Sequence, residues 1–102
     1  MKARQIISAG TGADLNISLG FVPDHVKILN VTTFDVNEMW ADEGTIKCNS
    51  QMNADDGVVS IDADGILMYA GTPAIAKGIT LDASAISNVN TNVLVVLAET
   101  YV

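Results

Sequence analysis

The chain has 102 residues, a formal net charge of −7 and only five basic side chains, scattered apart from Lys2 and Arg4. So few cations cannot displace the counterions of a phosphate backbone, which argues against nucleic acid as a partner. Hydrophobic residues make up 49% of the chain and charged residues only 17%. We expect one domain over residues 1–102, with part of its apolar excess buried against another chain.

The chain carries no mark of secretion or of membrane insertion. After residues 1–5, only two isoleucines precede the next polar residues, so no secretory signal is expected. No apolar run approaches the ~20 residues that span a membrane. The single cysteine, Cys48, forbids a disulfide within the chain and fits a strand. We expect a protein that is made in the cytoplasm and either stays soluble or joins an assembly.

The first third of the chain predicts three strands. Residues 2–8 form the first and end at a glycine-rich turn over residues 10–12. Residues 13–20 alternate apolar and polar side chains, which predicts a half-buried strand. Pro23 excludes a helix there, and residues 26–33 are apolar on both faces. Such a strand is expected at the centre of a sheet, covered on each side.

The next segment, residues 34–44, is ambiguous. Asp35 and Glu38 fit a capping box for a single helical turn, but the same residues fit equally well a strand that bears Met39 and Trp40. We favour an irregular or extended segment whose Trp40 packs against the edge of the core. Residues 45–50 then predict a short strand.

Residues 58–62 and 66–70 predict a β-hairpin. The pair Asp64-Gly65 between them is a strong signal for a tight turn. Residues 71–73 contain Gly and Pro and end the second arm.

The last third predicts two more strands, a brief one at residues 79–81 and a longer one that closes the chain over residues 93–102 and is apolar on both faces until Glu99. Residues 82–87 fit a bend or one helical turn. Because residues 93–99 are apolar on both faces, they form either the central strand of the core or a strand that buries one face in a partner. The whole pattern predicts an all-β fold: a small antiparallel β-sandwich or barrel-like domain of about eight short strands, with little or no helix.

The candidate chemical sites are weak. His25 is the only histidine, and its neighbour Asp24 points to the opposite face of a strand, so we interpret it as a turn residue on the surface. The acidic turns at residues 55–57 and 62–65 lack the other ligands of a calcium loop. One Cys and one His cannot make an ordinary zinc site. We predict no catalytic residue, no cofactor and no metal.

Two stretches together resemble small virion structural proteins of tailed bacteriophages. They are residues 20–32, GFVPDHVKILNVT, and residues 78–98, GITLDASAISNVNTNVLVVLA. The first is similar to a Gly-Phe-x-Pro-aromatic-Val-Lys-Val-x-Asn strand, with His25 in the aromatic position, and the second to a terminal strand in which Leu94 and Val95 replace tyrosines. The resemblance covers about a third of the chain and is closest to the decoration, or cement, proteins of capsids.

This resemblance implies a non-enzymatic protein on the capsid exterior that binds the major capsid protein, stabilises the expanded head and forms a dimer or trimer. Residues 1–7 are a candidate contact arm, because Lys2 and Arg4 stand out in an acidic chain and a terminal strand can extend a neighbour's sheet. An ordinary first strand is the other interpretation. The candidate partner-binding residues are Lys2, Arg4, Ile6 and Trp40.

Three alternatives remain. A phage tail or fibre component is the first, although such a module more often shows repeats. A carbohydrate-binding module requires Trp40 and either Tyr69 or Tyr101 exposed on one face, whereas we expect most of the five aromatic residues to serve the core. An enzyme requires His25 in a cleft with Asp and Ser partners.

Overall fold

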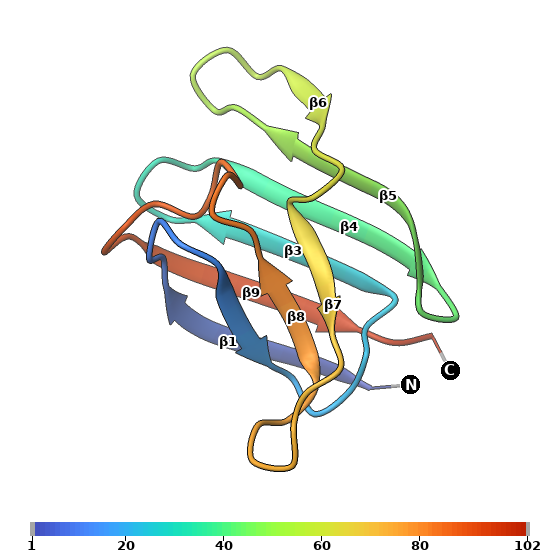
Figure 1. The fold of residues 1–102 in the computed structure, drawn as a ribbon. Coiled ribbons are helices and arrows are strands. Elements are labelled where there is room, and N and C mark those ends of the chain that lie inside the picture. Colours follow the sequence, from blue (N-terminus) through green and yellow to red (C-terminus); the bar gives the residue numbers. More distant parts are fainter. Residues whose placement is uncertain (1, 102) are drawn as a thin grey trace.

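The computed structural model describes residues 2–101, in which nine antiparallel strands form two sheets and no helix is present (Figure 1). The larger sheet has the order β1-β9-β3-β4-β5-β6, and the smaller has the order β2-β8-β7. The sandwich expected from the sequence is therefore confirmed, as two open sheets. The strands are β1 (Ala3–Ala9), β2 (Leu15–Ser18), β3 (His25–Asn30), β4 (Val36–Asp42), β5 (Thr45–Met52), β6 (Val59–Ile61), β7 (Ile66–Tyr69), β8 (Gly78–Leu81) and β9 (Val93–Glu99).

The core lies between one face of the large sheet and the small sheet. Alternate residues of each strand point inward, so every second side chain of β3 and β9 is buried. Burying one such aliphatic side chain contributes about 1.5–3 kcal/mol, which makes this cluster the main source of stability. Its fully buried members are Val26, Ile28, Met39, Leu94 and Val96 from the large sheet, and Ile66, Ile79 and Leu81 from the small sheet.

Buried asparagines tie the two sheets and their loops together. Asn49 of β5 donates to the Ile66 carbonyl oxygen (2.7 Å) and accepts from the Ile66 N–H (3.3 Å), and so joins the large sheet to β7. Asn88 accepts from the backbone N–H groups of Thr11 (2.9 Å) and Gly12 (3.2 Å). These amides satisfy backbone groups that no strand partner reaches.

The predicted hairpin over residues 58–70 is wrong. Its tight turn exists, because the Gly65 N–H donates to the Asp62 carbonyl oxygen (3.1 Å). However, β6 pairs with β5 and β7 pairs with β8, so the chain crosses here from one sheet to the other. Ile66 is fully buried and held by Asn49, and this contact directs β7 into the small sheet.

Of the interpretations of residues 34–44, the strand is confirmed and the packing of Trp40 is corrected. The segment contains a regular strand, β4, whose Asn37 and Met39 side chains are fully buried. Because strand side chains alternate, Trp40 stands on the opposite, outer face and is 43% exposed. Trp40 therefore does not pack against the core edge. The expectation that most aromatic residues serve the core is wrong too, because Phe21 alone of the five belongs to the buried cluster.

Candidate functional site

The small sheet covers one face of the large sheet, and within residues 2–101 no second layer covers the other (Figure 1). We call this uncovered side the outer face. The prediction that residues 26–33 are covered on each side is therefore wrong, although β3 does lie centrally, between β9 and β4. Its outer side chains Lys27 and Leu29 are exposed and half-buried, respectively.

One row of the outer face is entirely apolar. The strand registers place one aliphatic or methionine side chain from each of the six strands side by side. We call this set the apolar row; in spatial order it is Ile7, Val95, Leu29, Val36, Met52 and Val59. The four central side chains are half-buried by their neighbours, whereas Ile7 and Val59 at the ends are 63% and 66% exposed. A continuous apolar surface of this kind marks an interaction site.

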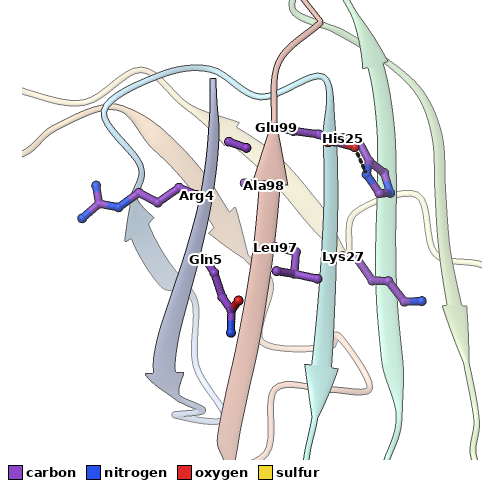
Figure 2. A pocket seen from close by; sticks show the side chains of 8 residues that line it. Arg4, Gln5, His25, Lys27, Leu97, Ala98 and Glu99 are labelled. Carbon is purple, nitrogen blue, oxygen red and sulfur yellow. Dashed lines mark hydrogen bonds and ion pairs between the residues drawn. The ribbon is translucent and has the colours of Figure 1, made fainter. Parts of the chain in front are cut away.

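Next to the apolar row, the outer face is hollowed around Leu97, which is 46% exposed (Figure 2). The hollow is about 360 Å³ and is lined by Gln5 of β1, Lys27 of β3 and Glu99 of β9. Arg4 points away from it in Figure 2. A second hollow of about 170 Å³ lies on the other side of Lys27, beside Val36 and other members of the apolar row. The outer face is thus apolar along one row and also has hollows that could receive the side chains of a partner.

A charged and aromatic cluster lies at one end of the outer face. His25 of β3 has both ring nitrogens against carboxylates: Nε2 is 2.6 Å from Glu38 Oε2, and Nδ1 is 3.0 Å from Glu99 Oε1. The His25 ring stacks on Trp40 of β4, with centroids 3.8 Å apart and planes 24° apart. Tyr101 donates its hydroxyl to Glu99 Oε1 (3.0 Å), and its ring centroid is 6.5 Å from that of Trp40.

The position of His25 corrects its interpretation as a surface turn residue. It is the first residue of β3, and its side chain is only 15% exposed. Both ring nitrogens lie within hydrogen-bond distance of a carboxylate, so His25 bridges Glu38 of β4 and Glu99 of β9. In the described part of the chain, no serine or threonine forms a hydrogen bond with the His25 ring.

The four predicted partner-binding residues do not form one patch. Residues 3–9, which include most of the predicted arm, form β1 at the edge of the chain's own large sheet. Arg4 donates to the Leu19 carbonyl oxygen (3.2 Å), and Ile6 packs against the core, so both point toward the small sheet. Trp40 lies on the outer face, three strands away from β1. The role of these residues in binding stays a prediction.

Sequence reasoning missed the apolar row and the carboxylate pair around His25. The signal for the row was present, because residues 26–31 and 93–97 are apolar on both faces. The cluster left no such signal, because Glu38 and Glu99 lie 13 and 74 positions from His25. In the described part of the chain, no group of three or more His, Cys, Asp or Glu side chains is arranged to hold a metal ion, and no helix could span a membrane.

Comparisons with protein-family models, with curated proteins and with solved structures find no match for this chain.

Proposed function

We propose that this protein is a non-enzymatic structural protein of a phage virion that binds the outer surface of the capsid and stabilises the expanded head. The resemblance of residues 20–32 and 78–98 to virion structural proteins suggests the setting. The observation that carries the proposal is the apolar row, a surface that crosses all six strands of the large sheet without a covering layer. The major capsid protein is the proposed partner.

The proposed mechanism is differential binding. A protein that binds the assembled lattice but not free capsid subunits shifts the equilibrium toward the lattice by mass action. Each contact is modest, but contacts repeated over a shell act together and resist its disruption. The net charge of −7 keeps the unbound protein soluble despite its apolar outer face.

The test is co-sedimentation of the purified protein with expanded heads that lack it, followed by thermal disruption of the heads. We expect saturable binding and a raised disruption temperature. Leu97→Lys places a charge in the outer-face hollow and should weaken binding at least about tenfold. Ile75→Lys is the matched control, because Ile75 is 45% exposed and Leu97 is 46% exposed, but Ile75 lies in the loop before β8.

Two results would reject the proposal. One is failure of the unmodified protein to bind heads, and binding to purified tails instead would support a tail component. The other is equal binding by both lysine variants, which would remove the outer face from the contact.

A second candidate function, carbohydrate binding, is favoured by one specific observation. Trp40 and Tyr101 are 43% and 53% exposed, and their rings stack in one cluster, as a sugar-stacking platform requires. Against it, His25 already covers one face of the indole at 3.8 Å. Because Trp40 is the only tryptophan, its fluorescence can be titrated with maltoheptaose, cellohexaose and chitohexaose. A saturable change that Tyr101→Ala abolishes would support this function, and an unchanged spectrum would remove it for these sugars.

A further inference from the structure

Within residues 2–101, the large sheet ends in two strands that lack a partner on one side, β1 and β6. In β1, the Thr100 N–H donates to the Lys2 carbonyl oxygen (2.8 Å) and the Gly10 N–H to the Asn92 carbonyl oxygen (2.8 Å). In an antiparallel strand, the backbone N–H and C=O groups of successive residues point to opposite sides of the strand. The backbone groups of the even-numbered residues of β1 therefore point toward β9. The backbone N–H and C=O groups of Ala3, Gln5, Ile7 and Ala9 therefore point away from the sheet.

The same reasoning applies to β6. The Asn53 N–H donates to the Val58 carbonyl oxygen (3.0 Å), and the Asp62 N–H donates to the Asn49 carbonyl oxygen (2.9 Å). The backbone groups of Val58 and Asp62 thus point toward β5, and the backbone groups of Val59 and Ile61 point away from the sheet. All three residues of β6 are exposed, and Ile61 is the most exposed large apolar residue, at 84%.

The two edges differ in how they are protected. An exposed edge strand invites pairing with another chain, and proteins blunt such edges with very short strands, lysine, proline or a bulge. The β6 strand, Val59-Ser60-Ile61, is short, but it contains no lysine or proline, all its residues are exposed, and it lies away from the small sheet in Figure 1. The β6 edge is therefore open to a partner strand that brings apolar side chains.

Charge distinguishes the possible partners of this edge. Asp62 and Asp64 follow β6 directly, whereas Lys2 and Arg4 lie at the start of β1. Antiparallel pairing of two β6 strands about a two-fold axis would bring Asp64 of each copy toward Asp56 of the other. Antiparallel pairing of two β1 strands would leave the cations of the two copies at opposite ends and would gain no opposite charge. Pairing β6 of one copy with β1 of the next joins opposite charges instead.

The direction and pleat of the strands also agree with pairing of β6 of one copy with β1 of the next, a contact that we call the joint. The six strands alternate in direction, so β1 and β6 run opposite ways and a second copy in the same orientation meets the first with antiparallel strands. The residues with outward backbone groups on both edges carry their side chains on the outer face. A register that pairs Ile7 with Val59 therefore continues the apolar row from one copy to the next. The same register places Arg4 opposite Asp62 and brings Lys2 beside Asp64, which lies in the turn after β6.

We propose that copies of this chain join head to tail, with β1 of one copy pairing antiparallel with β6 of the next, Ile7 opposite Val59. Such a heterologous contact builds a closed ring of at least three copies or an open chain, depending on the rotation at each joint. The joint does not depend on which surface the protein binds, so it is tested without phage heads, and its failure leaves the head-binding assay to decide separately.

The test uses one proline variant for each edge. Gln5→Pro and Ile61→Pro each remove an outward N–H that makes no bond within the sheet, and proline is tolerated at such edge positions. Gln5→Ala and Ile61→Ala are the matched controls that keep the N–H. Sedimentation velocity measures the mass of each variant alone and of the two proline variants mixed in equal amounts, and circular dichroism confirms that each is folded.

We expect the unmodified protein to form species of three or more copies and each proline variant to be monomeric. The mixture should give dimers and nothing larger, because each variant retains one intact edge and only the β1 edge of one fits the β6 edge of the other. A monomeric unmodified protein, a mixture that stays monomeric, or a dimer formed by one proline variant alone would each overturn the proposal.

If a proline variant fails to fold, an exchange of charges tests the proposed pairing of β1 with β6. Lys2→Asp alone places two acids beside each other at every joint and should reduce assembly. The double variant Lys2→Asp with Asp64→Lys restores an opposite-charge pair only if residue 2 of one copy lies beside residue 64 of the next. Recovery of assembly in the double variant supports the register, and no recovery overturns it.

Discussion

His25 and Trp40 are cross-strand partners on β3 and β4, and their rings stack with centroids 3.8 Å apart on the outer face. The same imidazole touches Glu38 on β4 and Glu99 on β9. One side chain thus links three neighbouring strands and lies between two carboxylates. This arrangement holds one end of the outer face in a fixed geometry.

The first prediction concerns this link. His25→Ala removes the side chain that contacts both carboxylates and leaves Trp40 without its stacking partner. We expect the free energy of unfolding to fall by about 1–2 kcal/mol, a value reduced for solvent screening because the glutamates are partly exposed. Urea denaturation followed by circular dichroism measures it. Adding Glu38→Gln and Glu99→Gln should recover part of the loss, and equal stability of the single and triple variants would contradict an electrostatic role.

The second prediction concerns the link between the two sheets. Asn49→Ala removes both hydrogen bonds to the backbone of Ile66, which is fully buried. Leaving these groups without partners should lower the free energy of unfolding by about 2–4 kcal/mol. Asn16→Ala is the control, because Asn16 bonds only the exposed Thr80 hydroxyl and should cost less than about 0.5 kcal/mol. Similar losses in both variants would show that Asn49 does not join the sheets.

Local patterns were sufficient to predict most of the strands but not their partners. The alternation over residues 13–20 and the apolar residues of 93–99 predicted β2 and β9 because side-chain period follows directly from strand geometry. The false hairpin at residues 58–70 contained a real turn. What separates its arms is the contact of Ile66 with Asn49, 17 positions away, and no local turn signal carries that information.

The faces of the sheet show a second limit of the sequence. A strand that is apolar on both faces has the same sequence pattern whether its second face is covered by its own chain or by another chain. Residues 93–99 left both possibilities open, and residues 26–33 were assigned to full cover. The structure leaves Leu97 and Lys27 exposed on the outer face. The low content of charged residues was the better indicator of an uncovered surface.

The third prediction concerns the close approach of β2 and β8. A Cβ atom on Gly78 would lie 2.1 Å from the Ile17 carbonyl oxygen and 2.8 Å from the Leu19 nitrogen. Gly78→Ala must therefore separate these backbones and should lower the free energy of unfolding by about 3 kcal/mol. Gly44→Asn is the control: Gly44 has φ of +80° with nothing near its Cβ position, and Asn tolerates that conformation, so the cost should stay below about 1 kcal/mol. Equal thermal stability of both variants would contradict the close approach.

The fourth prediction concerns the ionisation of Tyr101. Partial desolvation, and then the hydrogen bond and negative charge of Glu99, raise the pKa of Tyr101 above its ordinary value of 10.0. Because the folded state holds this proton more tightly, the resulting stability is present below the ordinary value and is lost as the pH rises through the raised pKa. Ultraviolet titration of the phenolate, with Tyr101→Phe to assign the band, measures this pKa. Glu99→Gln should lower it toward the ordinary value, and an unchanged titration curve would show that Glu99 does not act on Tyr101.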